Sequence, residues 1–259
     1  MQANQRTALI TGASAGLGKE FARQLAAQGY QLVLVARNAD KLEETAASLR
    51  QEYKVNTHCI CADLCDESAP QALFDELQQR GLEIDYLVNN AGVAGPNLLE
   101  ETDWQQQRDF YQLMMLSMAQ LCHLLVPPMQ SRGFGRVINI ASVAGRLARA
   151  GGCNYGPSKA WVIAMSEELA LTVAGDGVLV CALCPGYTHT EFHQRAQLMD
   201  MKNSMPKWMW YDAEVVVREG LRACERGKRV YSSGRLYRWL DPLFQSVFTR
   251  RLFTMNDGR

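Results

Sequence analysis

TGASAGLG, residues 11–18, is the stretch that decides how the chain folds. It follows the short apolar run TALIT at 7–11 and leads into an amphipathic stretch at 17–28. A strand that turns through glycines into a helix lets the backbone approach a phosphate, and the start of the helix attracts negative charge. The stretch therefore predicts a phosphate-binding turn, with an unliganded tight turn as the alternative. Its three glycines, spaced GxxxGxG, are Gly12, Gly16 and Gly18.

The same alternation of strand and helix continues along the chain. Further apolar, strand-like runs lie at 31–36, 56–62, 84–90, 135–142, 178–184 and 228–233. Amphipathic stretches with helical spacing lie at 17–28, 39–53, 68–80, 101–126, 155–174 and 213–225. Continuous apolar strands are typical of a sheet covered on both faces. The pattern predicts an α/β fold: a doubly wound, Rossmann-type parallel sheet of seven strands with helices on both faces.

No low-complexity linker interrupts the pattern, so residues 1–259 are predicted to form one Rossmann-type dinucleotide-binding and catalytic domain. Residues 187–212, rich in Met and Trp, are expected to form a lid over a substrate. Packing of this segment onto the body of the protein is the alternative. The tail at 234–259 carries aromatic residues and arginines. It could pack on a second subunit, cap the substrate mouth or touch a membrane surface, and we favour the first of these.

Composition excludes several classes of protein. The 27 Lys and Arg balance 27 Asp and Glu, so no basic excess is present to hold a nucleic acid backbone. A polar N-terminus and the lack of a long apolar run predict neither signal peptide nor membrane span, and hence a cytoplasmic protein. Most of the eight cysteines lie in apolar runs, which favours free thiols over disulfides. The spacing of Cys59, Cys61 and Cys65 is not that of a zinc site, so no metal is expected.

The end of the second strand carries a cation where many dinucleotide-binding proteins carry an acid. In LVARN, Arg37 stands at the position that would contact the adenosine ribose. A guanidinium pairs with a 2′-phosphate, so the residue predicts NADP(H) in preference to NAD(H). Pairing of Arg37 with a nearby carboxylate is the alternative. Asp63, followed by Leu64 after the third strand, could contact the adenine or cap the next turn.

NYGPSKA, residues 154–160, is predicted to begin a helix. Asn154 is a good N-cap, and Pro157 falls in the first turn, where its missing N–H costs nothing. Tyr155 and Lys159 are then neighbours on one face of the helix. An ammonium close to a phenol lowers the phenol's pKa from about 10, which suits acid–base chemistry. A partly exposed Tyr beside a solvated Lys is the alternative.

Together these motifs resemble the short-chain dehydrogenase/reductase (SDR) family in its single-domain form. The resemblance covers residues 5–190 well and the remainder loosely, and Ser142 lies 13 residues before Tyr155, the family's usual interval. It implies hydride transfer between NADP(H) and a carbonyl or alcohol substrate, which we expect to be apolar. The motifs that carry it are TGASAGLG, NNAG at 89–92, NIASVAG around Ser142, YGPSK at 155–159 and PGYTHT at 185–190.

The resemblance also implies the roles of individual residues. Tyr155 would be the acid–base, Lys159 would lower its pKa and bind the nicotinamide ribose, and Ser142 would orient the substrate oxygen. Homo-dimers or homo-tetramers are usual in the family. The residues expected to bind the cofactor are Gly12, Ser14, Ala15, Gly16, Leu17, Gly18, Arg37, Asp63, Leu64, Asn90, Ala91, Gly92, Tyr155, Lys159, Pro185, Gly186, Thr188 and Thr190.

One position departs from the family's pattern. Many members carry an asparagine in the helix before the serine strand, where it bends the helix and holds a water of a proton relay. Met114 stands there in this chain, and a thioether cannot replace that amide. Met114 therefore keeps one alternative to an active enzyme open: a catalytically idle dinucleotide-binding protein that acts as a sensor or interaction partner. A structural protein that binds no nucleotide is a further alternative, against which the glycine turn and Arg37 stand.

Overall fold

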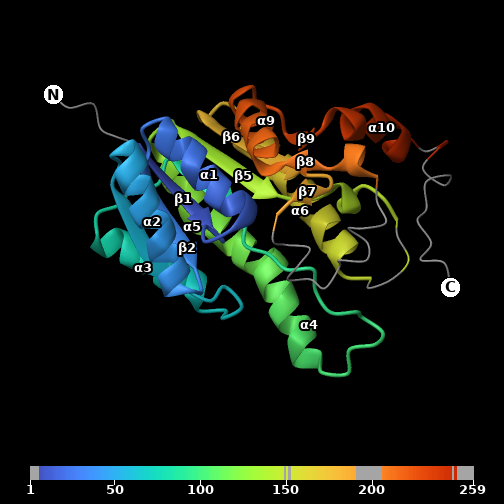
Figure 1. Cartoon of the computed structure of the whole chain (residues 1–259), viewed down its shortest axis with the longest axis horizontal. Helices are drawn as coiled ribbons and strands as arrows, with labels where there is room; N and C mark the ends of the chain where they lie inside the picture. The colour runs from blue at the N-terminus through green and yellow to red at the C-terminus, as the bar shows by residue number, and fades with distance from the viewer. Residues whose placement is uncertain (1–5, 149, 151–152, 191–205, 247, 250–259) are drawn as a thin grey trace.

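The computed structural model describes residues 6–148, 150, 153–190, 206–246 and 248–249 (Figure 1). A parallel sheet runs through the middle in the order β3-β2-β1-β4-β5-β6-β9, which confirms the predicted seven-stranded, doubly wound fold. Its strands are β1 (Thr7–Thr11), β2 (Gln31–Ala36), β3 (Thr57–Cys61), β4 (Tyr86–Asn89), β5 (Gly135–Ile140), β6 (Val178–Cys184) and β9 (Val230–Ser232).

Helices cover both faces of the sheet. Successive strand residues point to opposite faces, so Ala8 and Ile10 of β1 enter one core and Leu9 enters the other. The first core is closed by α1 (Gly16–Ala27), α2 (Ala39–Tyr53) and α9 (Ala213–Glu225). The second is closed by α3 (Ala69–Gln79), α5 (Ser117–Ser131) and α6 (Tyr155–Thr172). Burial on both faces explains why the strands are continuous apolar runs.

The predicted helix over 101–126 is wrong in its bounds. Asp103 caps the start by accepting from the Gln105 N–H (3.0 Å), and α4 (Trp104–Tyr111) begins there. A π-helical turn, η1 (Gln112–Leu116), then joins α4 to α5. The helix continues through Pro127 and Pro128 to Ser131. Pro127 is exposed, so the hydrogen bond that it cannot make is lost on the side that faces solvent.

The segment after β6 holds structure that the sequence pattern did not predict. A two-stranded ladder pairs β7 (Thr188–His189) with β8 (Tyr211–Asp212), and a 3₁₀ turn, η3 (Lys207–Met209), precedes β8. The predicted lid at 187–212 is described only at its two ends, because residues 191–205 lie outside the described part. The tail begins with a further helix, α10 (Arg235–Gln245), which lies beside β9 and β8 (Figure 1).

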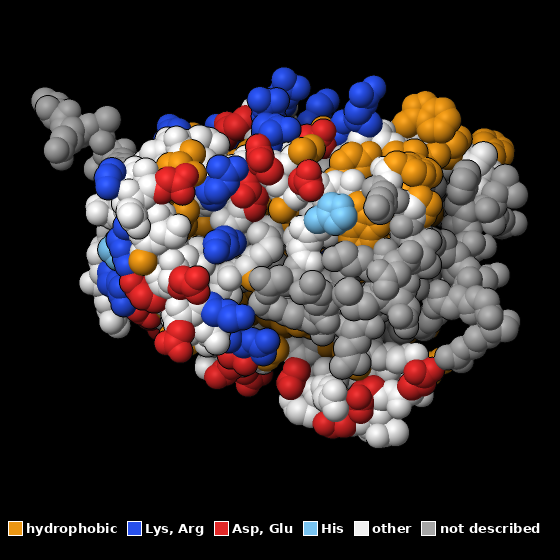
Figure 2. Space-filling model, in the orientation of Figure 1, with side chains coloured by type: hydrophobic (Ala, Val, Ile, Leu, Met, Phe, Trp, Pro, Cys, Tyr) orange, Lys and Arg blue, Asp and Glu red, His pale blue; other side chains and the backbone are white. Residues whose placement is uncertain are grey.

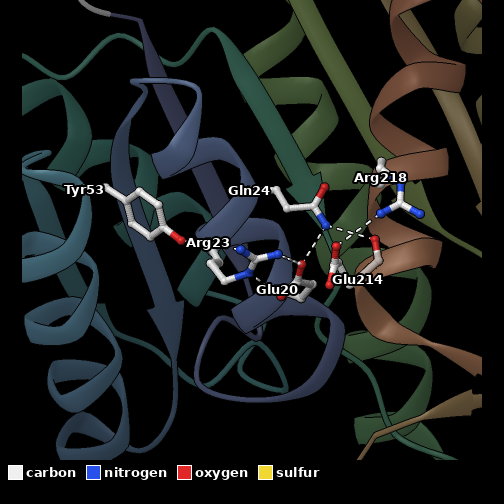
Figure 3. Close-up of polar contacts among 6 residues, drawn as sticks. All are labelled: Glu20, Arg23, Gln24, Tyr53, Glu214 and Arg218. Atoms are coloured by element: carbon white, nitrogen blue, oxygen red, sulfur yellow. Dashed lines mark hydrogen bonds and ion pairs between the residues drawn. The ribbon is translucent and has the colours of Figure 1, made fainter.

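Polar contacts fasten α1 to its neighbouring helices (Figure 3). The Arg23 guanidinium donates to both Glu20 oxygens (2.8 Å each) and reaches the Tyr53 hydroxyl of α2 (3.4 Å). Gln24 donates to the Glu214 carbonyl at the start of α9 (2.9 Å). Burial raises the pKa of Glu20, but the hydrogen bonds from Arg23 and Gln24 outweigh it and the pKa is lowered. The helix that follows the glycine turn is thus held on both sides.

The helical stretch Trp104–Ser131, 28 residues long, is long and apolar enough to cross a bilayer by length and composition. Half of its most apolar window is buried inside the fold, and the core helix of a water-soluble protein passes the same test. The length and composition of this helix are therefore only weak evidence for a membrane span. The sequence predicts no such span.

All eight cysteines lie within the described residues and are free thiols. Cys122, Cys181, Cys184 and Cys224 are buried, whereas Cys61 and Cys153 are exposed. Burial raises the pKa of Cys184 and of Cys224 to about 12, so both stay neutral in the core. Over the described ranges, no group of three or more His, Cys, Asp and Glu side chains is arranged to hold a metal ion.

Candidate active site

The glycine turn closes so tightly that side chains are excluded. Gly12 and Gly16 adopt positive φ angles of 65° and 54°, a region that disfavours residues with a Cβ. A Cβ on Gly18 would lie 2.2 Å from the Gly12 carbonyl oxygen. The residue at the N-cap of α1 is Ala15, whose methyl group cannot accept from the first backbone N–H groups of the helix. The turn therefore presents a backbone cradle and an uncapped helix N-terminus, as an anionic phosphate group requires.

Asn90 and Thr11 join this turn to the end of β4. Asn90 Nδ2 donates to the Thr11 carbonyl (2.9 Å), and the Thr11 hydroxyl accepts from the backbone N–H groups of Asn90 (2.9 Å) and Ala91 (3.0 Å). These bonds cross the point where the strand order reverses between β1 and β4, which is where open α/β sheets bind ligands. Sequence reasoning named Asn90 and Ala91 but missed Thr11, although it lies inside the quoted stretch.

Arg37 follows β2, at the expected adenosine end of the site. Its Nη1 lies 3.7 Å from Asp63 Oδ2, and both side chains are at least half exposed (63% and 50%). Such an ion pair contributes little to stability, so Arg37 can exchange Asp63 for a stronger anion. Asp63 also accepts from the Cys65 N–H (3.1 Å), which is the turn-capping role left open by the sequence. Leu64 is buried beneath it.

Ser142 and Tyr155 meet at the carboxyl end of β5. Ser142 precedes a short 3₁₀ turn, η2 (Val143–Gly145), and its hydroxyl accepts from the Ala144 N–H (3.1 Å). Tyr155 is the first residue of α6, and its hydroxyl lies close enough to Ser142 for that side chain to lower its pKa. The two hydroxyls thus converge at one edge of the sheet, as the sequence analysis expects.

Lys159 lies one turn further along α6 and is 4% exposed. Its Nζ donates to the Ile140 carbonyl (2.8 Å) and lies 5.7 Å from the centre of the Tyr155 ring. Burial lowers the pKa of Lys159 to about 8, against a smaller opposing effect of Cys184. The alternative of a solvated lysine is therefore wrong.

The expected lowering of the Tyr155 pKa is also wrong in this structure. Burial raises the pKa of Tyr155 to about 12, and the hydrogen bond with Ser142 only partly opposes that rise. The ammonium of Lys159 is held by the Ile140 carbonyl rather than by the phenol oxygen. Tyr155 is consequently a protonated phenol at neutral pH, which suits a proton donor.

The buried Lys159 should leave a pH-dependent mark on stability. Between pH 8 and the unfolded value of 10.5, the unfolded chain holds a proton that the folded chain has released, so this group's contribution to stability rises with pH. We expect the melting temperature of Lys159→Met minus that of wild type to fall as pH rises through about 8. Differential scanning calorimetry from pH 7 to pH 10 measures it, with exposed Lys228→Met as control. A difference that stays constant with pH contradicts the burial of a charged amine.

Asn154 does not cap α6 with its side chain, contrary to the sequence-based prediction. It is 2% exposed and accepts from the Tyr111 hydroxyl (2.8 Å), while its amide donates to the Pro96 carbonyl (2.9 Å) and to Gln107 Oε1 (2.5 Å). The residue before Tyr155 is therefore bonded to α4 and to the loop after β4. Because these partners are 43 to 58 residues away, the local pattern gives no sign of them.

Met114 lies in the π-helical turn η1 and is 1% exposed. Its sulfur accepts from the Val93 N–H (3.3 Å), and a Cβ on Gly92 would lie 3.2 Å from it. The helix therefore departs from α-helical geometry here without the family's asparagine. Ser117, one turn on, donates to the Leu113 carbonyl (3.0 Å), so its hydroxyl is used within the helix.

The turn after β6 completes the site. The Pro185 carbonyl accepts from the Val143 N–H (3.1 Å), and the buried Thr188 donates to the Gly186 carbonyl (3.0 Å). A Cβ on Gly16 would lie 3.4 Å from Thr190, so this segment reaches the glycine turn. The expected residues thus gather at the carboxyl ends of β1, β2, β3, β4, β5 and β6: Gly12, Ser14, Ala15, Gly16, Leu17, Gly18, Arg37, Asp63, Leu64, Asn90, Ala91, Gly92, Ser142, Tyr155, Lys159, Pro185, Gly186, Thr188 and Thr190.

Known proteins share this architecture. A family model described as short chain dehydrogenase matches residues 6–200. Sulfoacetaldehyde reductase 2 of Chromohalobacter salexigens is 34% identical over 186 residues, which cover 71% of this chain and 73% of that protein. A short-chain dehydrogenase from Sphingobium yanoikuyae, solved in complex with NADPH, is 31% identical with a TM-score of 0.80 and 90% of each chain covered. The bulky-bulky ketone specific alcohol dehydrogenase of Comamonas testosteroni is 28% identical, with a TM-score of 0.77 and 95% and 94% covered. With its parallel sheet, its glycine turn and the Ser142, Tyr155 and Lys159 cluster, the chain belongs to the short-chain dehydrogenase/reductase family of oxidoreductases.

Proposed function

We propose that the protein transfers a hydride between NADP(H) and a carbonyl or alcohol substrate, with Tyr155 as the acid–base. The observation that carries this proposal is the proximity of Ser142 to Tyr155, with Lys159 one turn away on α6. Two hydroxyl donors at one point can stabilise charge that develops on a single substrate oxygen. The solved Sphingobium yanoikuyae relative, which is in complex with NADPH, supports the choice of cofactor.

The described residues fit a dinucleotide. The glycine turn and the uncapped start of α1 would hold the pyrophosphate, because the N-cap residue Ala15 leaves the first backbone N–H groups of the helix without a side-chain acceptor. Arg37 would pair with the 2′-phosphate, and Lys159 would reach the nicotinamide ribose. When bound, the nicotinamide supplies or accepts the hydride.

The protein's own groups then handle the proton. In reduction, Ser142 donates a hydrogen bond to the substrate carbonyl oxygen and fixes its place. The Tyr155 phenol gives its proton to that oxygen as hydride reaches the carbon, so a C–H and an O–H bond form and the carbonyl π bond breaks. The raised pKa of Tyr155 keeps the proton available at neutral pH. Lys159, still mostly charged at pH 7, stabilises the phenolate that remains.

The substrate is proposed to be an apolar carbonyl or alcohol compound. The loop after β4 contributes Val93, 36% exposed, directly after Gly92. The Comamonas testosteroni relative, whose name specifies bulky ketones, supports a roomy apolar site. The named substrate of the Chromohalobacter salexigens relative is a small anionic aldehyde, so a substrate panel should include both kinds.

We also propose a homo-dimer or homo-tetramer in the cytoplasm. The helices α5 and α6 cover the second core, yet Leu116, where η1 meets α5, and Leu171, near the end of α6, are more than half exposed. A second subunit that packs on α5 and α6 would cover these two leucines. Sedimentation velocity would give the state of assembly.

The direct test is turnover. Purified full-length protein is mixed with NADPH and a panel of aromatic, aliphatic and anionic ketones and aldehydes, and loss of NADPH absorbance is followed. Turnover of at least one carbonyl, absent in Ser142→Ala, supports the proposal. Tight NADPH binding without turnover of any substrate would favour the idle dinucleotide-binding protein. Lack of binding to any dinucleotide would favour a structural protein.

Met114 gives a test of proton supply. Met114→Asn is expected to raise kcat or change its solvent isotope effect, because an amide can hold a water that a thioether cannot. The side-chain carbonyl oxygen of the introduced asparagine can accept from the Val93 N–H, as the Met114 sulfur does in wild type. We therefore expect the Kd for NADPH not to change. An unsatisfied buried amide costs about 1–3 kcal/mol of stability, so the variant is also expected to melt at a lower temperature. If the melting temperature is all that changes, and turnover is equal in H₂O and D₂O for both proteins, then Met114 is a packing residue.

A further inference from the structure

Three side chains on one face of α10 point to the active-site loops. Tyr237, Asp241 and Gln245 follow one another at intervals of four residues and so lie along one side of the helix. On other sides of the helix, Trp239 is 74% exposed and Leu243 is 36% exposed. Figure 2 shows hydrophobic side chains at the surface in the region of α10. The helix therefore depends on a few specific contacts for its position.

The first contact is made by Tyr237, which is 5% exposed. Its hydroxyl donates to the Met209 carbonyl (3.1 Å) and accepts from the Tyr187 N–H (3.3 Å). Its ring packs against Gly186 so closely that a Cβ there would lie 1.9 Å from a ring carbon. The start of α10 is thus fitted to the turn after β6.

The second contact is a two-pronged ion pair. Arg146 Nε and Nη2 donate to the two oxygens of Asp241 at 2.5 and 2.6 Å. Both side chains are largely buried, with 14% and 24% exposed. One turn further on, Gln245 donates to the Arg146 carbonyl (3.1 Å). Paired, partly desolvated hydrogen bonds of this kind fix geometry as well as contributing energy.

Arg146 lies only four residues after Ser142. The Gly145 N–H donates to the Ser142 carbonyl and the Arg146 N–H donates to the Val143 carbonyl, each at 3.0 Å. On the other side of this turn, a Cβ on Gly145 would lie 2.6 Å from the Lys159 backbone carbon. The Ser142 turn is therefore held between α6 and α10, without room to move on the α6 side.

We propose that Arg146 and Asp241 are positioning residues that lock the Ser142 hydroxyl in place, and that α10 thereby links the tail of the chain to the reacting centre. The inference rests on the proposed function of Ser142. Neither side chain needs to touch the substrate. Loosening their ion pair lets the Ser142 turn move away from Tyr155, so the substrate oxygen loses one of its two donors.

The test compares Asp241→Asn with a matched variant that removes a different contact of α10. Glu219 of α9 accepts from Arg238 Nη1 (2.8 Å) and from the Gly234 N–H (2.9 Å), so Glu219→Gln loosens α10 without touching the Ser142 turn. We expect Asp241→Asn to lower kcat by on the order of tenfold, with the Kd for NADPH unchanged. Glu219→Gln should keep kcat within about twofold, and Asp241→Glu should recover part of the loss.

Hydrogen exchange gives a readout that does not depend on turnover. The backbone amides of residues 143–146 should exchange faster in Asp241→Asn than in wild type or Glu219→Gln. Unchanged exchange there, or an equal loss of kcat in both variants, overturns the inference. If wild type turns over no carbonyl while exchange responds as expected, the link stands and the proposed function fails.

Discussion

Tyr155→Phe is expected to abolish turnover while leaving NADPH affinity nearly intact. The substitution keeps the ring at the start of α6 and removes only the oxygen that carries the proton. General acid catalysis contributes about 10²–10⁴ to a rate, and in this site Ser142 alone would remain as donor. Steady-state kinetics together with fluorescence titration of NADPH measure both quantities.

Tyr53→Phe is the matched control, since it removes a hydroxyl that accepts from Arg23 on the far side of α1. It should retain wild-type kcat. If Tyr155→Phe turned over its substrate at a rate close to wild type, the proton would come from another group, and the assignment of Tyr155 as acid–base would be refuted.

Arg37→Asp is expected to reverse the preference between NADPH and NADH. A guanidinium that pairs with the 2′-phosphate contributes about 1.5–3 kcal/mol, so NADPH affinity should fall roughly 10- to 100-fold. An aspartate in its place can accept from the ribose hydroxyls, so NADH affinity should rise. Titration of both cofactors against wild type and variant gives the ratio.

Asp63→Asn distinguishes recognition of the 2′-phosphate by Arg37 from a simple ion pair between Arg37 and Asp63. If Arg37 serves only its 3.7 Å contact with Asp63, then removing either partner leaves the cofactor preference unchanged. Arg218→Asp, which changes a partly exposed arginine of α9, controls for the general effect of net charge. Equal affinity of the wild-type protein for NADPH and NADH would count against the assignment of Arg37.

The fold was predictable where local pattern and burial agree. The expected bounds are correct for three strands that are continuous apolar runs, β1, β2 and β6. They are also correct for two helices whose apolar residues repeat at helical spacing, α2 and α9. The helix α10 was missed, since RLYRWLDPLFQ mixes arginines, aromatics and Pro242. Its face is set by contacts with Gly186 and Arg146, which lie far away in the sequence.

The candidate site was predictable as a set of motifs but not as a network. Helical spacing brought Tyr155 and Lys159 together, and the family resemblance added Ser142, which lies near Tyr155 in the structure. It could not give the direction of the Tyr155 pKa, because burial by distant elements raises that pKa and Ser142 opposes the rise only in part. Nor could it show that Asn154 bonds to α4, since the choice between capping and tertiary contact depends on partners outside the local window.

The two exposed cysteines lie at opposite ends of the proposed cofactor site. Cys61 donates from its sulfur to the Arg37 carbonyl (3.2 Å), at the adenosine end, and Cys153 precedes Tyr155 by two residues, at the reacting end. The four buried thiols are shielded from reagents, and burial raises the pKa of the half-buried Cys59 and Cys65 to about 11, so a maleimide dye would react first at Cys61 and Cys153. Replacing one of them, together with Cys59 and Cys65, by serine leaves the other as the only thiol that is not buried. Stopped-flow fluorescence could then follow binding of the cofactor with the dye at Cys61 and binding of the substrate with the dye at Cys153.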